Sequence, residues 1–267
     1  MLYPTKNPRT FTEAAPWRWA VVGGILGLLL AVVLLAPAGW LAAALHQATL
    51  GRVQLVETVG TVWTGSGRLL LTGGSGSRDS AALPGRVKWK LRPAGLALGL
   101  DVSADCCTPR PLQVRAEPRW SGVSVQIFDN TSEWPTNLLS GLGAPWNTVR
   151  ADGNLQLMTQ GLTLEWLKGQ VAVSGRAELT AVGLTSSLTT LKPMGSYRIS
   201  LTGGNTIELK LTTLQGGLQL SGSGRWVGSR LQFEGVASAA PNDEAALSNL
   251  LNIIGRRNGP RSIITLG

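Results

Sequence analysis

The stretch from Ala20 to Leu45 constrains this chain most, because its 26 residues carry no charge. Trp17 and Trp19 precede it, and Trp40 lies near its end. The 20 residues between Trp19 and Trp40 would cover about 30 Å as a helix, which matches the hydrocarbon core of a bilayer. Indole rings prefer the membrane interface, whereas a soluble core helix that is apolar on every face is uncommon near an N-terminus. We therefore predict a transmembrane helix at residues 19–45, with these three tryptophans at its interfaces.

The charges before this stretch predict its orientation. Three bases precede it against one acid: Lys6, Arg9 and Arg18 against Glu13. Short flanks rich in Lys and Arg stay in the cytoplasm. We expect residues 1–18 to be a cytoplasmic tail and residues 46–267 to form a domain on the other side of the membrane.

A cleaved signal peptide is the alternative to an anchor, because Ala36-Pro37-Ala38 resembles a small-residue cleavage site. The apolar run is longer than an ordinary signal-peptide core, and a proline lies inside that site. We favour an uncleaved signal-anchor whose helix ends or kinks at Pro37 and Gly39.

Gly23 and Gly27 form a GxxxG pair within the span. Such a pair lets a second helix approach closely, so this face is a candidate for a homodimer or for association with another membrane protein. Glycine is also common in membrane spans, and on that interpretation the pair has no role.

Charge excludes one class of partner. The chain has 24 Lys and Arg against 15 Asp and Glu, and residues 46–267 retain 21 and 14 of them, a formal net charge of +7. A nucleic-acid site would need basic residues clustered among stacking aromatics, and here the charges are scattered singly. We expect no nucleic acid; a basic surface instead suits anionic lipid or an acidic partner.

The two cysteines, Cys106 and Cys107, are neighbours. Their Cα atoms would lie about 3.8 Å apart across a trans peptide, below the usual disulfide range of about 4.4–6.8 Å. Three states are open: a strained vicinal disulfide in an oxidising compartment, two free thiols, or pairing with another molecule. The simplest role is to stiffen a turn.

Most of the exported part alternates apolar and polar residues, as half-buried strands do. Val87, Trp89 and Leu91 alternate with basic residues, and short glycine turns separate successive segments. We predict a mainly β domain: a curled antiparallel meander, half-barrel-like, with one or two short helices. Residues 132–149 break the alternation around Pro135 and predict one short helix, which would separate two similar halves at 46–131 and 150–267.

A second helix is predicted from Asn242 to Ile254. Asn242 is a good N-cap; four apolar residues follow at i, i+3, i+4 and i+7, namely Leu247, Leu250, Leu251 and Ile254. Gly255 suits a left-handed C′ position, and Arg256 and Arg257 suit the negative end of the helix dipole. A final strand is predicted at 262–266.

Trp63, Trp89, Trp166 and Trp226 fall within strand patterns and are most simply core residues. The alternative is that some of them line an exposed apolar groove. A long sheet with one apolar face and few helices must curl on itself, bind a partner or hold lipid.

The sequence offers no catalytic, cofactor or metal residues. His46 is the single histidine, so a Ser–His–Asp triad, a Cys–His pair and a histidine metal site are not expected. Gly60–Gly65 has phosphate-loop spacing without the Lys-Ser/Thr that follows. Gly222-x-Gly224 lacks a third glycine and a helix, so it is not a dinucleotide site. We do not expect an enzyme.

Several segments, taken in order, resemble one family. These are Gly60-Thr61-Val62-Trp63-Thr64-Gly65, Trp89-Lys90-Leu91-Arg92-Pro93, Pro193-Met194-Gly195-Ser196-Tyr197, the run from Leu211 to Trp226 and the helix to Gly255. Together with the anchor they resemble type II secretion system protein N, the general secretion pathway N component of Gram-negative bacteria, and distantly the AsmA-type proteins.

The resemblance implies a bitopic inner-membrane protein with a periplasmic β-rich domain. It implies a non-enzymatic accessory of the machine that exports folded proteins across the outer membrane, with other inner-membrane or secretin subunits as partners. The distant AsmA likeness implies the alternative, a periplasmic sheet that binds or transfers lipid. The family supplies no catalytic residues to this sequence.

Overall fold

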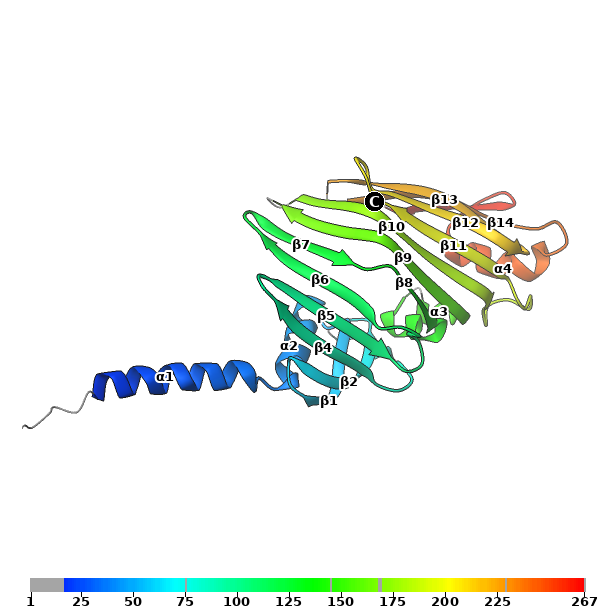
Figure 1. Ribbon diagram of the computed structural model, residues 1–267. Coiled ribbons are helices and arrows are strands. Elements are labelled where there is room, and N and C mark those ends of the chain that lie inside the picture. The colour runs from blue at the N-terminus through cyan, green and yellow to red at the C-terminus, as the bar shows by residue number, and fades with distance from the viewer. Residues whose placement is uncertain (1–16, 75, 145, 168–169, 229, 267) are drawn as a thin grey trace, which may run out of the picture. The chain divides into compact units, whose positions relative to one another are not determined.

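A computed structural model describes residues 17–74, 76–144, 146–167, 170–228 and 230–266. The chain divides into two compact units, Met1–Ala36 and Pro37–Gly267, which are described separately. Most of the predicted cytoplasmic tail, including Lys6, Arg9 and Glu13, lies outside the described residues. The described part of the first unit is the helix α1, Trp17–Leu34 (Figure 1). Among the described residues, α1 is the one helix long and apolar enough to cross a membrane.

The end or kink predicted at Pro37 and Gly39 is a full break, so the apolar stretch forms two helices and does not continue as one helix to Leu45. α1 ends at Leu34, and α2, Ala38–Ala48, begins after Pro37. Pro37 has extended backbone angles (φ −68°, ψ 147°). Its ring disfavours helical angles in Ala36 and its nitrogen has no hydrogen to donate, so α1 cannot continue through it. Trp40 consequently lies in α2, within the second unit.

One antiparallel sheet of 16 strands builds the second unit. Its first eight strands are β1 Val53–Gly60, β2 Thr64–Thr72, β3 Ser80–Ala82, β4 Val87–Ala94, β5 Ala97–Ala104, β6 Leu112–Arg119, β7 Gly122–Ile127 and β8 Asn130–Pro135. The others are β9 Asp152–Leu167, β10 Gln170–Thr185, β11 Gly195–Thr202, β12 Glu208–Gly216, β13 Leu218–Val227, β14 Arg230–Ala239, β15 Arg256–Asn258 and β16 Arg261–Leu266.

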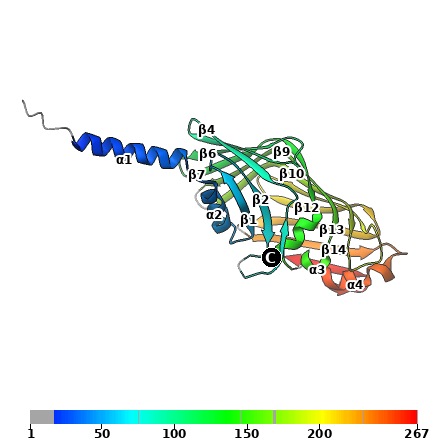
Figure 2. The ribbon, with the colours of Figure 1, turned by 90° about the horizontal axis from the view of Figure 1, so that it is seen from below.

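The strands follow one another as a meander that curls without closing (Figures 1 and 2). The sheet begins at β1 and ends at β15, which do not pair with each other in the described chain; β3 and β8 are short additions beside β2 and β9. The predicted mainly β fold, a curled antiparallel meander with few helices, is confirmed. Most connections are short, so most strands pair with their neighbours in sequence.

The register gives the sheet one apolar and one polar face. Leu91 pairs with Leu100, Leu100 with Val114, and Val114 with Ile127, so one row across β4 to β7 is entirely apolar. The adjacent row carries Lys90 opposite Asp101. This is the alternation that the sequence predicted, because successive side chains of a strand point to opposite faces.

Two separate clusters bury parts of this apolar face. The N-terminal cluster consists of Leu83, Val87, Ala104, Cys107 and Leu138. The C-terminal cluster consists of Met194, Tyr197, Leu218, Ala237, Leu247, Leu250 and Leu251. Each is sealed by a helical segment: η1 covers the first and α4 covers the second.

The single short helix predicted in the middle of the chain is divided into two shorter helical segments. Strand β8 extends to Pro135, which caps the 3-10 helix η1, Thr136–Leu142, from an extended position. A four-residue helix α3, Trp146–Val149, follows. The sheet is not interrupted, because β7 pairs with β9 directly. The two predicted halves therefore share one sheet.

The C-terminal helix α4, Glu244–Ile254, is confirmed, but both predicted caps are wrong. Asp243, one residue after Asn242, occupies the N-cap without a capping hydrogen bond, and Gly255 is extended (φ −171°). The chain leaves the helix directly into β15, which places Arg256 and Arg257 in a strand. A Cβ on Gly255 would lie 2.5 Å from the Ile263 carbonyl oxygen, so this glycine allows close strand approach.

The tryptophans predicted as core residues divide three ways. Trp89 is buried, Trp63 and Trp226 are half-buried, and Trp166 is 42% exposed. The prediction is therefore wrong for Trp166, which stands near the end of β9.

Candidate functional site

The turn between β1 and β2 carries the phosphate-loop spacing, but it joins two antiparallel strands. Gly60 has φ +96°, and a Cβ there would lie 2.5 Å from the Thr64 carbonyl oxygen. The Thr61 amide donates to that same oxygen at 2.9 Å. Glycine is required here because other residues rarely adopt this conformation.

This turn holds the indole of Trp89. The Nε1 hydrogen of Trp89 is shared between the carbonyl oxygens of Thr61 and Val62, at 3.2 and 3.1 Å. The ring lies against Gly65, where a Cβ would come within 2.5 Å of it. Trp89 is only 4% exposed, so its apolar body and its polar tip are both satisfied. The two segments 60–65 and 89–93 thus form one packed unit with a structural role.

A bulge in β1 lies beside this unit, at Glu57. The register between β1 and β2 shifts between Val56 and Val59, and Glu57 has φ +52°. A non-glycine residue in this region costs about 1–3 kcal/mol and needs support from its surroundings.

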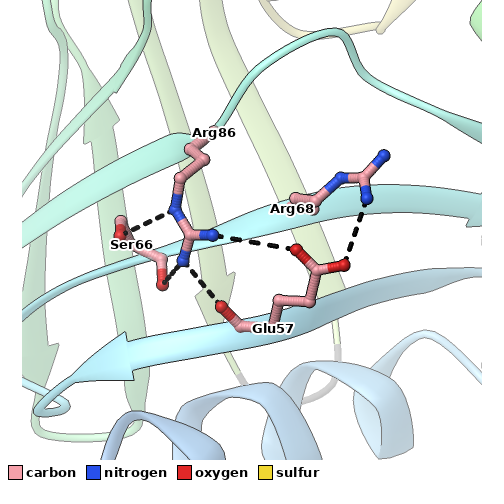
Figure 3. Close-up of polar contacts among 4 residues, drawn as sticks. All are labelled: Glu57, Ser66, Arg68 and Arg86. Atoms are coloured by element: carbon pink, nitrogen blue, oxygen red, sulfur yellow. Dashed lines mark hydrogen bonds and ion pairs between the residues drawn. The ribbon is translucent and has the colours of Figure 1, made fainter.

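Two arginines supply that support (Figure 3). The Arg86 guanidinium donates to the Glu57 carbonyl oxygen at 2.6 Å, and to the Ser66 hydroxyl and carbonyl oxygens at 3.1 and 3.2 Å. The Glu57 carboxylate lies 3.1 Å from Arg68 and 3.9 Å from Arg86. Because the ion pairs are exposed they contribute little; the hydrogen bonds from Arg86 to the backbone fix the bulge.

The glycine pair that was considered and rejected as a dinucleotide site makes room for an aromatic ring. Gly222 and Gly224 lie in β13, where Gly224 pairs with Phe233 of β14 and Gly222 pairs with Gly235. A Cβ on Gly222 would lie 2.5 Å from the Phe233 ring, and one on Gly224 would lie 3.0 Å from it. Their absent side chains allow Phe233 to lie flat on the sheet, where it is buried.

The cysteine pair lies in the turn after β5. Cys106 and Cys107 are joined as a vicinal disulfide in the structure, with Cα atoms 3.7 Å apart. Cys106 is exposed, whereas Cys107 is 2% exposed and belongs to the N-terminal cluster. The Cys107 carbonyl accepts from the Glu133 amide at 2.8 Å, which ties this turn to β8. Oxidation of the pair in the cell stays a prediction.

The remaining predicted site residues lie on the two N-terminal helices. Gly23 and Gly27 stand on α1, with nothing within 4 Å of an added Cβ. Trp17 and Trp19 are exposed at the start of α1, and Trp40 is 56% exposed in the first turn of α2. Association through the glycines and membrane contact by the tryptophans stay predictions.

We next consider the side chains in the described residues that could bind a metal or take part in acid–base chemistry. No group of three His, Cys, Asp or Glu side chains in that part of the chain could hold a metal ion. His46 is exposed on α2. Burial raises the pKa of the Tyr197 hydroxyl, which donates to the Leu218 carbonyl oxygen at 3.1 Å within the C-terminal cluster. Such a tyrosine stays protonated and packs as a core residue.

Comparison with known proteins places this fold in a family. The model of the family described as type II secretion system (T2SS), protein N, matches residues 51–264. The match begins just before β1 and ends within β16, so it covers nearly the whole sheet. No curated protein and no solved structure gives a significant match. The chain therefore belongs to the type II secretion system protein N family.

Proposed function

We propose that this protein is a single-pass inner-membrane component of the type II secretion machinery. In this proposal its N-terminus is cytoplasmic, and its β unit stands in the periplasm and assists the export of folded proteins. The observation that carries it is the family match over 51–264 on a chain that also has an exposed apolar helix, α1. Lys6 and Arg9 precede that helix and Arg18 lies in its first turn, which supports a cytoplasmic N-terminus.

The proposed role is one of assembly rather than catalysis. The polar contacts around Glu57, Trp89 and Tyr197 all fix backbone or core positions. Partners are expected on the polar face of the sheet, where Gln113 and Gln126 are exposed on β6 and β7. We expect those partners to be other inner-membrane or secretin subunits.

Photo-crosslinking in the bacterium tests this proposal. A photoreactive residue replaces Gln113 or Gln126, and replacement of Leu100 on the apolar face serves as the matched control. We expect the first two positions to give adducts with another secretion subunit, identified by mass spectrometry, and deletion of the gene to reduce export of folded proteins. If the polar face yields no secretion subunit while export is intact, the proposal is wrong.

A second candidate function is lipid binding, favoured by the open centre of the apolar face. Leu100, Val114 and Val125 lie on this face and are half-buried, and they belong to neither cluster. An open sheet with an apolar face needs a partner or a lipid to cover it.

Lipid analysis of the full chain, washed in detergent, separates the two candidates. Bound phospholipid that is lost in Val114→Glu but kept in Gln113→Glu would support lipid binding at this face. Equal lipid content in both variants and in the unchanged protein would exclude it.

A further inference from the structure

The turns between consecutive strands fall alternately on the two edges of the meander. One edge carries the turns of β1–β2, β4–β5, β6–β7, β9–β10, β11–β12 and β13–β14. The first four of these lie next to one another along the sheet (Figure 1), and we call the part of the edge that they form the hairpin rim. The opposite edge carries the cysteine turn, the β10–β11 connection and the turn at Gly216-Gly217.

The chain enters the β unit at the hairpin rim. Pro37 forms an isolated antiparallel bridge with Thr61, which belongs to the β1–β2 turn. Two residues, Leu35 and Ala36, separate α1 from Pro37, and this connection can span at most about 11 Å. If α1 crosses a membrane, the rim must therefore start close to the surface of that membrane.

Large apolar side chains stand exposed along this rim. Trp120 and Leu96 sit in the β6–β7 and β4–β5 turns and are 106% and 91% exposed. Val59 beside the β1–β2 turn is 65% exposed, and Trp40 is 56% exposed. Trp166 pairs with Val171 at the end of the β9–β10 hairpin, and both are exposed.

These residues contradict ordinary turn chemistry, which favours Gly, Asn, Asp, Ser and Pro. The rest of the same edge follows that chemistry at Gly203-Gly204 and at Gly228, and the opposite edge follows it at Gly216-Gly217 and at Asp105. Tryptophan and leucine at a tip are unfavourable in water but favourable in the interfacial region of a bilayer, where indole rings concentrate. The neighbouring bases are also exposed. Arg92 and Arg119 pair with Asp101 and Glu117, whereas Lys90 can reach anionic headgroups.

We propose that the hairpin rim rests on the bilayer that α1 enters, with Trp40, Leu96, Trp120 and Trp166 inserted among the lipid headgroups. The occupant of this surface is the lipid bilayer itself. The proposal rests on the membrane anchorage proposed above. It adds that the β unit lies against the membrane by its rim, which leaves the opposite edge for partners farther into the periplasm.

Fluorescence quenching in liposomes tests this orientation with the full chain. A fluorescent amino acid is placed at Ser121 in the rim or at Ser187, which is exposed in the β10–β11 connection of the opposite edge. The lipids carry a nitroxide on the headgroup. We expect quenching at position 121 to exceed quenching at 187 by about twofold or more, because nitroxides reach only groups near the interface.

Matched substitutions identify the contact. The double change Leu96→Ser and Trp120→Ser should lower quenching at 121 to the level at 187. Trp146→Ser removes a 43% exposed tryptophan from α3, which is not part of the rim, and should leave quenching at position 121 unchanged. Equal quenching at 121 and 187 in the unchanged protein, or no effect of the double change, would overturn the proposal.

Carbonate extraction separates this proposal from the anchorage on which it rests. Protein that stays in the membrane after extraction but shows no rim quenching refutes the rim contact alone. Protein that is extracted refutes the anchor and, with it, the rim contact.

Discussion

The two buried clusters of this sheet are sealed in different ways. At the C-terminal cluster an amphipathic helix, α4, inserts Leu247, Leu250 and Leu251, each at most 1% exposed. At the N-terminal cluster the cover is irregular: the 3-10 helix η1 contributes Leu138, and the loop after the short strand β3 contributes Leu83. One part of the apolar face is thus covered by a regular amphipathic helix, and the other part is covered by irregular segments.

The two covering segments, α4 and η1, are held in place by different interactions. An α-helix places i, i+3 and i+4 on one face, so its three leucines act as one apolar surface. The residues of η1 are held by individual bonds instead. Thr136 donates to the Gly153 carbonyl at 2.8 Å, and Gly141 packs so closely that a Cβ would lie 2.3 Å from the Leu71 carbonyl oxygen.

The C-terminal cluster should show the largest effect of a single truncation. Leu250→Ala removes a fully buried side chain from a helix face that cannot collapse without moving the sheet, so the free energy of unfolding should fall by about 2–5 kcal/mol. Urea unfolding of the full chain in detergent measures the loss. Ile253→Ala on the exposed side of the same helix is the matched control, and a similar loss there would show that α4 is not the cover.

The N-terminal cluster should lose less. Leu138→Ala should cost about 2–3 kcal/mol, at the lower end of the range for buried leucines, because the irregular cover can relax into the cavity. The comparison is Asn137→Ala, which changes an exposed neighbour and should shift stability by less than about 0.5 kcal/mol.

Hydrogen exchange would show whether the clusters are coupled. Because β7 pairs with β9, we expect Leu138→Ala to raise exchange on both sides of that junction. Exchange that rises only in β2 to β5 would mean that the two clusters unfold independently.

The regular, periodic elements of the fold could be predicted from the sequence, whereas the irregular ones could not. Alternation predicted the strands and the apolar face, and the leucine spacing predicted α4, because both patterns are local and periodic. Pro37 also predicted the break between α1 and α2. The division of residues 132–149 into η1 and α3 and the caps of α4 were not predicted. They depend on where strands pair: Gly255 is extended because β15 must reach β16.

The local sites divide likewise. The glycines of 60–65 indicated a turn, but the indole of Trp89 that the turn holds comes from another strand. Nothing in the alternation around Glu57 marked its bulge, and the guanidinium that fixes it belongs to Arg86, 29 residues later. The hairpin rim could not be predicted from the sequence either, because it depends on the strand topology that places alternate turns on one edge.

Tyr197 offers a smaller test within the C-terminal cluster. Tyr197→Phe removes the bond to the Leu218 carbonyl and should cost about 1 kcal/mol. Burial raises the pKa of this hydroxyl above its ordinary value of 10.0. The unfolded chain releases this proton above pH 10 and the folded chain retains it, so folding stability is unaffected below pH 10 and falls as the pH rises beyond it.

Alkaline unfolding measures this contribution. The Tyr197→Phe protein should lose less stability between pH 9 and 11 than the unchanged protein. Tyr3, the other tyrosine, precedes the β unit in the sequence and provides the control substitution. Identical alkaline profiles for Tyr197→Phe and the unchanged protein would contradict the burial of this hydroxyl.

The cysteine pair should have the smallest effect, although it lies in the N-terminal cluster. A disulfide stabilises mainly by closing a loop in the unfolded chain, and Cys106 and Cys107 are adjacent, so the bond closes almost none. We expect protein from the periplasm to show the oxidised mass and to gain two hydrogens on reduction. Urea unfolding with and without reductant should differ by less than about 1 kcal/mol. A larger loss would mean that the disulfide stabilises the irregular segments that cover the N-terminal cluster. That cluster would then depend on a covalent bond, whereas the C-terminal cluster depends on the helix α4.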